Sequence, residues 1–182
     1  MGNFLIRPAR PADAEAVREI SWITCEEGFG LATPSEFSRT IDMERNAIQK
    51  AGSSPAWSRF LTAESEGKIV GFLHFIRRTE DKYRHHGSFG MSILPEYRSH
   101  GIGACLLREL IGWAEQQPGL EKITLEVLAG NKSAIHLYEK FMFQEEGRLQ
   151  NHVYFKKSFD DLLLMALFVS YTNLENPKSP AD

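Results

Sequence analysis

The sequence predicts an α/β domain, with α+β character, in which helices flank a mixed central sheet. Short apolar runs of strand length alternate with longer segments whose apolar residues recur at helical spacing. One of those runs ends in a glycine-rich turn that leads directly into an amphipathic segment. The length, 182 residues, suits one domain with a substantial core. We therefore expect a single domain over residues 1–171, followed by a disordered tail over 172–182.

The first part of the chain predicts one strand and two helices. A short strand over residues 4–7 is followed by Pro11, which suits the first turn of a helix. Residues 26–32, with two glycines, are expected to form a loop. Residues 33–36, Thr-Pro-Ser-Glu, have the pattern of a capping box with proline at the first helical position, which predicts a second helix ending near Lys50.

The remaining elements follow from alternating and helical apolar patterns. In order, we expect a hairpin (59–64 and 69–75), a strand (88–94), a helix (104–115), a strand (122–128), a helix (131–141) and a closing hairpin (153–155 and 162–169). The predicted order is β-α-α-β-β-β-α-β-α-β-β, which places the strands in one mixed sheet.

Composition excludes several classes of protein. Apolar residues make up 42% of the chain and charged residues 25%, and the net charge of −3 gives no electrostatic basis for binding nucleic acid. The sequence contains neither an apolar run of membrane-spanning length nor a secretory signal pattern. Cys25 and Cys105 lie in unrelated local patterns, so we expect no disulfide framework, no metal site and a reducing, cytoplasmic location.

A turn over residues 98–104 predicts an anion-binding site. Gly101 and Gly103 have no side chains to keep an anion from the first backbone amides of the next helix, which lie at the positive end of its dipole. Arg98 adds a permanent positive charge. The turn lacks the patterns of nucleoside triphosphatases and dinucleotide-binding proteins. We predict that a phosphate or pyrophosphate binds here, next to Arg98, Ser99, His100, Gly101, Ile102, Gly103 and Ala104.

Glu126, Asn131 and Tyr138 form a second motif. Asn131 occupies a helix N-cap position, and Tyr138 follows about two turns later, so both side chains are expected on one exposed helix face. A tyrosine there can donate its phenolic proton to a leaving group, and Glu126 can accept a proton directly or through water. The structural alternatives are a core role for Tyr138 and a cross-strand lysine partner for Glu126.

Together these residues resemble the GNAT superfamily of acyl-CoA-dependent N-acetyltransferases. The similarity spans nearly the whole chain and is most specific at residues 98–103 and 131–138. It implies that the turn binds the pyrophosphate of coenzyme A and that Asn131 hydrogen-bonds the pantetheine arm. It also implies Tyr138 as proton donor to the departing thiolate and Glu126 as an aid to amine deprotonation. The backbone groups offered to the arm and the acyl carbonyl are those of Met91, Ser92 and Ile93.

The chain departs from the family pattern at Met142, where glycine is common. Methionine is strained there if the position requires a positive φ. The resemblance also places the loop containing Glu26 and Glu27 over the acceptor, although a solvated helix end explains this acidic pair equally well.

We therefore predict an enzyme that transfers an acetyl group directly from acetyl-CoA to a primary amine, without a metal ion. The acceptor is a small molecule or a protein amine, with a slight preference for a small polar amine. Many relatives pair through a C-terminal strand, which favours a homodimer. The alternatives are a catalytically silent module that binds coenzyme A as a regulator and a transferase that uses another acyl-CoA donor.

Overall fold

The computed structural model describes residues 4–30 and 32–169, so the tail expected over 172–182 lies outside the described residues. The predicted order of helices and strands is confirmed, with two additional short 3₁₀ turns at Pro11–Asp13 and Pro95–Tyr97. The elements are β1 (Phe4–Pro8), α1 (Ala14–Glu27), α2 (Ile41–Ser53), β2 (Ser58–Ser65), β3 (Lys68–Arg77), β4 (His86–Ile93), α3 (Ile102–Ala114), β5 (Lys122–Leu128), α4 (Lys132–Lys140), β6 (Gln144–Phe155) and β7 (Ser158–Phe168).

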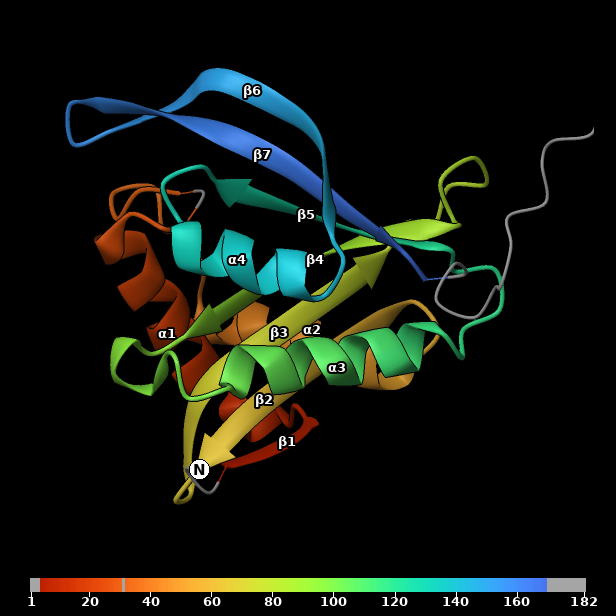
Figure 1. Cartoon of the computed structure of the whole chain (residues 1–182). Coiled ribbons are helices and arrows are strands. Elements are labelled where there is room, and N and C mark those ends of the chain that lie inside the picture. Colours follow the sequence, from red (N-terminus) through yellow and green to blue (C-terminus); the bar gives the residue numbers. More distant parts are fainter. Residues whose placement is uncertain (1–3, 31, 170–182) are drawn as a thin grey trace, which may run out of the picture.

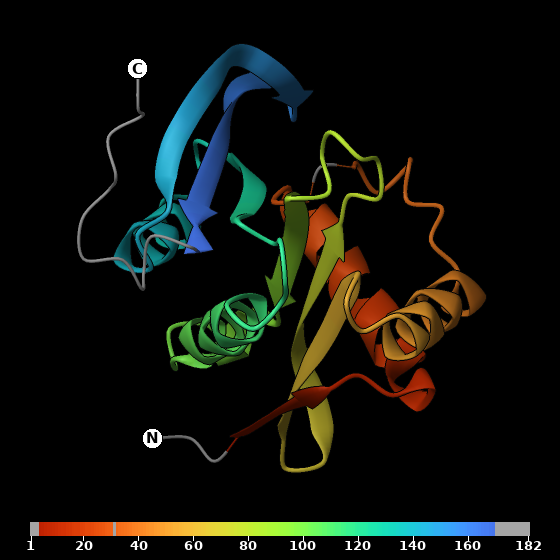
Figure 2. The ribbon, with the colours of Figure 1, turned by 90° about the vertical axis from the view of Figure 1, so that its right-hand side faces the viewer.

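The seven strands form one sheet in the order β1-β2-β3-β4-β5-β7-β6. Helices cover both faces: α3 and α4 lie on one face, and α1 and α2 on the other (Figures 1 and 2). The hairpin of β6 and β7 extends past the end of β5 (Figure 1). This layered arrangement lets each half-apolar sheet face bury its side chains against a helix.

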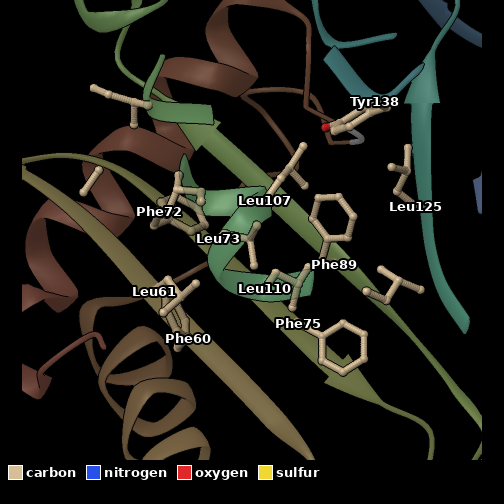
Figure 3. Close-up of a cluster of buried hydrophobic side chains, with 14 of the residues drawn as sticks. Phe60, Leu61, Phe72, Leu73, Phe75, Phe89, Leu107, Leu110, Leu125 and Tyr138 are labelled. Carbon is tan, nitrogen blue, oxygen red and sulfur yellow. The ribbon is translucent and has the colours of Figure 1, made fainter. Parts of the chain in front are cut away.

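The core lies mainly between the sheet and α3. Leu73 and Phe75 of β3 and Leu107 and Leu110 of α3 are completely buried and belong to one apolar cluster (Figure 3). Burying side chains of this size stabilises the fold by about 2 kcal/mol each. The cluster fixes α3, and therefore the turn that precedes it, against the sheet.

The sheet opens between β4 and β5, which are its only parallel neighbours among the described strands. They pair only from His86 with Lys122 to Ser88 with Thr124, and no pairing continues beyond these residues. Parallel strands that separate in this way expose backbone hydrogen-bonding groups on their facing edges.

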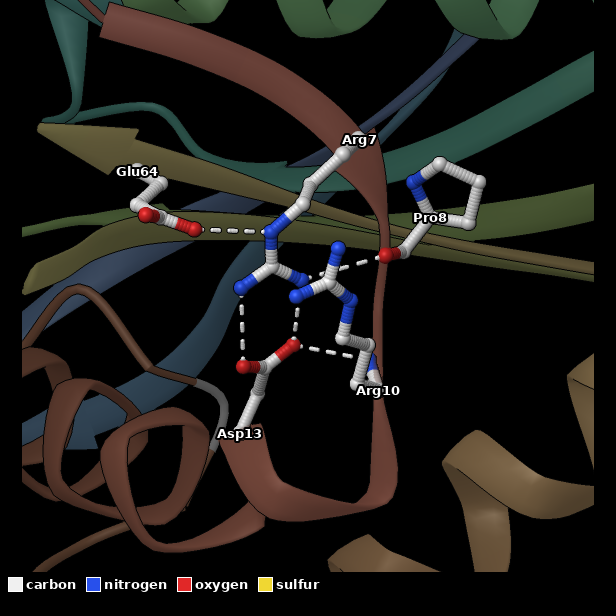
Figure 4. A network of polar contacts seen from close by, with 5 residues as sticks. All are labelled: Arg7, Pro8, Arg10, Asp13 and Glu64. Atoms are coloured by element: carbon white, nitrogen blue, oxygen red, sulfur yellow. Dashed lines mark hydrogen bonds and ion pairs between the residues drawn. The ribbon is translucent and has the colours of Figure 1, made fainter. Parts of the chain in front are cut away.

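A polar network joins β1 to the start of α1 (Figure 4). Arg7 bonds Asp13 (Nη1–Oδ2 2.7 Å) and Glu64 (Nε–Oε2 2.8 Å), and the Arg10 N–H donates to Asp13 Oδ2 at 2.7 Å. Burial alone would raise the pKa of the Asp13 carboxyl, but these hydrogen bonds outweigh it and lower that pKa. The network fixes the direction in which α1 leaves the sheet.

The predicted start of the second helix was wrong. Only half of the expected capping box forms: Glu36 Oε2 accepts from the Thr33 N–H at 2.9 Å, but the Thr33 hydroxyl also donates to that carboxylate, at 2.8 Å, and the Glu36 N–H donates to Thr33 O instead. They close only an isolated turn, and α2 begins at Ile41 after Thr40, whose side chain accepts from Met43 N–H at 3.2 Å. The first helix also extends through Glu27, so the acidic pair lies in a helical turn rather than in a loop.

Candidate active site

A groove lies between the N-termini of α3 and α4, and Gly101, Gly103, Ala104 and Ser99 of the predicted anion site line it. It encloses about 260 Å³. Gly101 has φ +89°, a conformation that glycine adopts without strain, and its carbonyl accepts the first helical hydrogen bond of α3, from Cys105 N–H at 3.1 Å. The amides that precede Cys105 therefore have no helical partner and are available to an anion.

Arg98 lines the same groove and is held in place by three groups. Its Nε donates to Ile93 O at 2.9 Å, and its two terminal nitrogens bond the carboxylate of Glu27. Its guanidinium also lies 5.9 Å from the ring centroid of Phe29. Arg98 thus lines the groove in an ion pair that the sequence did not indicate.

Two residues of the predicted anion site contribute differently from the rest. His100 is exposed, does not line the groove, and its Nδ1 lies 2.6 Å from Arg98 O. The side chain of Ile102 is 2% exposed and packs in the core, so only its backbone is available to a ligand. Gly103 has a second role, since a Cβ atom there would come within 2.8 Å of Leu137 Cδ2, and the glycine lets α3 and α4 approach closely.

The edge of β4 that faces the opening carries free backbone groups. Leu94 N–H donates to Val70 O at 2.9 Å, so in the antiparallel ladder every second residue of β4, including Ser92, bonds to β3. The N–H groups of Met91 and Ile93 therefore point toward the gap beside β5. All three predicted residues, Met91, Ser92 and Ile93, line the groove.

Asn131 is the N-cap of α4, as predicted. Its side-chain oxygen accepts from Ala134 N–H at 3.3 Å. Since the cap uses the oxygen, the amide nitrogen is available to donate to a ligand in the groove, which Asn131 lines.

The expected exposed position of Tyr138 was wrong. It is the buried residue of α4, 6% exposed, and lies near Phe89 (Figure 3). Its ring packs against Phe89 and Phe143 at centroid distances of 5.8 and 5.9 Å. Burial raises the pKa of Tyr138 to about 12, so the phenol stays protonated at neutral pH. Its hydroxyl forms no hydrogen bond with any residue that the structure describes, which leaves its proton available.

A second, larger cavity of about 830 Å³ adjoins the groove. Glu126 lines this cavity only, is exposed, and forms no ion pair with a described lysine. The two spaces adjoin, because six residues line both of them: Thr24, Phe29, Met91, Ser92, Asn131 and Tyr138. Tyr138 therefore lies where the groove meets the cavity.

Sequence reasoning missed several residues of this site. Thr24 and Phe29, from α1 and the segment after it, line both spaces, and His74 of β3 lines the larger one. Glu26 and Glu27 line neither, although Glu27 contacts the groove residue Arg98. No local pattern marks these residues, because each reaches the site through pairing or packing of distant segments.

The groove has the properties of a site for an extended anionic ligand: unpaired amides at one end, an apolar wall and a free strand edge. Residues 15–143 match the model of the Acetyltransferase (GNAT) family. An L-amino acid N-acetyltransferase of Escherichia coli is 24% identical over 169 residues, which cover 91% of this chain and 98% of that protein. A GNAT-family acetyltransferase structure from Streptococcus pneumoniae superposes with TM-score 0.83 at 30% identity, covering 91% of this chain and 99% of the other.

The chain belongs to the acetyltransferase (GNAT) family. A putative acetyltransferase from Salmonella typhimurium, solved with acetyl-CoA, shares the fold with TM-score 0.82 at 19% identity and covers 99% of this chain and 100% of that one. The protein is an acetyl-CoA-dependent N-acetyltransferase, which confirms the predicted reaction and acyl donor. In the described ranges, no group of three or more His, Cys, Asp or Glu side chains is placed to hold a metal ion.

Proposed function

We propose that the enzyme transfers the acetyl group directly between two substrates that meet at Tyr138, with Tyr138 as general acid and Glu126 as general base. The observation that carries this proposal is the position of Tyr138, which lines both the groove and the larger cavity. We assign the groove to acetyl-CoA and the larger cavity, the acceptor cavity from here on, to the amine.

The groove residues fit the chemistry of a thioester carrier. The unpaired amides after Gly101 and the charge of Arg98 bind the pyrophosphate, with Ser99 and Ala104 alongside. The free N–H groups of Met91 and Ile93 hydrogen-bond the pantetheine arm and polarise the acyl carbonyl oxygen, which favours attack on that carbonyl. Asn131 donates its amide hydrogen to the arm.

Two proton transfers complete the reaction. An amine must be neutral to attack, and Glu126 in the acceptor cavity accepts its proton directly or through water. The departing thiolate takes a proton from the Tyr138 hydroxyl, which is protonated at neutral pH; burial raises its pKa further, from 10.0 to about 12. Cys25 is buried and lines the acceptor cavity, but it does not line the groove assigned to the thioester, and Cys105 lines neither space. This placement is in keeping with transfer that avoids an acyl-enzyme.

For the acceptor we propose a small polar amine. Support comes from the likeness over nearly the full length to an L-amino acid N-acetyltransferase. A protein amine is the alternative, favoured by a local 35% identity over 82 residues to ribosomal protein bS18-alanine N-acetyltransferase of Escherichia coli. Mass spectrometry after incubation with small amines and with amino-terminal peptides distinguishes the two.

We also propose a cytoplasmic homodimer. Neither cysteine forms a disulfide, in keeping with a reducing compartment. Among the described helices, none has both the length and the apolar character needed to cross a membrane.

The proposed dimer forms through β6. This strand lies at the edge of the sheet, and Leu149 and Tyr154 on it are exposed. Sedimentation velocity of the pure protein tests the oligomeric state.

The substitution Tyr138→Phe tests the proposed mechanism. It removes only the hydroxyl and keeps the ring against Phe89 and Phe143, so the fold and the groove should be preserved. We expect kcat to fall about 100-fold, the usual loss when a general acid is removed, while the Kd for acetyl-CoA stays within about twofold. Thiol release and calorimetry measure the two quantities. An equal loss of turnover and binding would show that Tyr138 is structural.

A further inference from the structure

His74 of β3 and Gly90 of β4 lie side by side in the wall of the acceptor cavity. The two residues are directly paired in antiparallel register, and both line the cavity. A Cβ atom built on Gly90 would meet no other atom within 4 Å, so the space next to the imidazole is open. Side chains on directly paired residues are about 5 Å apart, so a ligand group above Gly90 contacts His74.

The hydrogen bonds of Ser58 determine which nitrogen of His74 carries the proton. Ser58 Oγ lies 3.1 Å from His74 Nε2 and donates its own hydrogen to Phe75 O at 3.0 Å. A hydroxyl has a single hydrogen, so Ser58 accepts from His74 and Nε2 must carry a proton. Nδ1 is then an acceptor, and no residue in the described part of the chain donates to it.

The imidazole is also held rigid and neutral. Its ring stacks on Phe60 with a centroid distance of 4.3 Å and an interplanar angle of 19°. Burial, assisted by the positive charge of Arg39, lowers the pKa of His74 to about 4. A neutral ring with one free acceptor nitrogen suits a hydrogen-bond donor and does not attract an anion.

We propose that His74 selects the acceptor. Its Nδ1 accepts a hydrogen bond from a hydroxyl or amide N–H that the acceptor carries in addition to its reacting amine, and the body of the acceptor fills the space above Gly90. This inference rests on the proposed function and names the class of acceptor: small amines with a second hydrogen-bond donor. A plain alkylamine leaves Nδ1 buried without a partner, which costs binding energy.

Two matched pairs of amines test the selection. Ethanolamine against propylamine and glycinamide against isobutylamine differ in polar groups but little in size. The hydroxyl and amide groups also lower the basicity of the amine, so kcat/KM is expressed per concentration of neutral amine. On that scale we expect the unmodified enzyme to favour the polar member of each pair by about tenfold, the equivalent of one good hydrogen bond. His74→Phe should abolish the preference, with the KM for acetyl-CoA changed by no more than about twofold.

Two amide variants separate the roles of the ring nitrogens. The side-chain oxygen of asparagine can occupy nearly the position of Nδ1, whereas the longer glutamine places its amide near Nε2. His74→Asn should therefore keep most of the preference, and His74→Gln should lose it. Gly90→Val, which fills the open space without a positive φ, should lower kcat/KM for every acceptor and leave the Kd for acetyl-CoA unchanged.

The outcomes distinguish this inference from the proposed function. Normal turnover with the same preference in His74→Phe overturns the role of His74 alone. Absence of thiol release with every amine, despite bound acetyl-CoA, overturns the proposed function and the acceptor class with it. Nitrogen NMR of histidine-labelled full-length protein near neutral pH should show His74 protonated at Nε2, and a signal from the Nδ1–H form overturns the inference whatever the amines show.

Discussion

The carboxylate of Glu27 holds the guanidinium of Arg98 through two hydrogen bonds, Nη1–Oε1 at 2.8 Å and Nη2–Oε2 at 2.5 Å. This pair joins the C-terminus of α1 to the anion-binding turn before α3. Both side chains are about one-third exposed, at 32% for Arg98 and 27% for Glu27, so solvent screens the attraction and the pair contributes little to stability. Its effect is on the groove, where a carboxylate lies beside a site assigned to a pyrophosphate.

Replacing that carboxylate should strengthen the binding of acetyl-CoA. Glu27→Gln removes a negative charge near the ligand phosphates, so we expect the Kd for acetyl-CoA to fall about threefold at low salt and the difference to shrink as salt is added. Calorimetry measures both. Glu26→Gln is the matched control, since it makes the same change of charge on an exposed neighbour whose side chain forms no ion pair with a described residue. Weaker binding of acetyl-CoA by Glu27→Gln would mean that Glu27 matters more for orienting Arg98 than for repelling the ligand phosphates.

Tyr138 should resist ionisation at alkaline pH. Burial raises its pKa from the usual 10.0 to about 12, so the folded protein binds this proton more tightly than the unfolded chain does. The stability linked to it is present below pH 10 and is lost as the pH rises toward 12, by about 3 kcal/mol for a two-unit shift. Absorbance of the phenolate during alkaline titration should show one delayed tyrosine, absent from Tyr138→Phe. Identical titration curves for Tyr138→Phe and the unmodified protein above pH 11 would contradict the burial.

The features that sequence predicted correctly are those set by neighbouring residues. The Gly101 turn, the Asn131 cap and the order of strands and helices follow from local conformational preferences and apolar spacing. The burial of Tyr138 depends on Phe89 and Phe143, which other segments bring against it. At Thr33 a local pattern misled the prediction: one bond of the capping box forms, but a single turn cannot by itself extend into a helix. The roles of Glu27 and His74 arise only from tertiary contacts.

The contact between α3 and α4 at Gly103 should limit the size of the residue there. A Cβ atom would come within 2.8 Å of Leu137 Cδ2 and 3.4 Å of Ile93 Cδ1, so Gly103→Val should push the helices apart and lower the free energy of unfolding by about 2 kcal/mol. Urea denaturation measures the loss.

The double variant Gly103→Val with Leu137→Ala is the control for this contact. Removing the leucine side chain makes room for the valine, so the double variant should be more stable than the sum of the two single losses predicts. Additive losses would show that Leu137 is not the group that Gly103 accommodates, and that the cost of valine comes from the backbone at the start of α3.

We expect Met142 to destabilise the fold, so that replacing it by glycine raises the free energy of unfolding. α4 ends in a Schellman motif: Phe143 N–H donates to Tyr138 O at 3.1 Å and Met142 N–H to Glu139 O at 2.9 Å. Met142 thereby has φ +66°, a left-handed conformation that is strained for a residue with a Cβ atom, while its side chain is 68% exposed and buries little. Met142→Gly should raise the free energy of unfolding by about 1 kcal/mol, measured in urea. Met142→Ala is the control, because alanine retains the Cβ atom and therefore the backbone strain. It should change the free energy of unfolding by less than about 0.5 kcal/mol. An equal gain from alanine would show that the effect comes from the methionine side chain and not from the backbone.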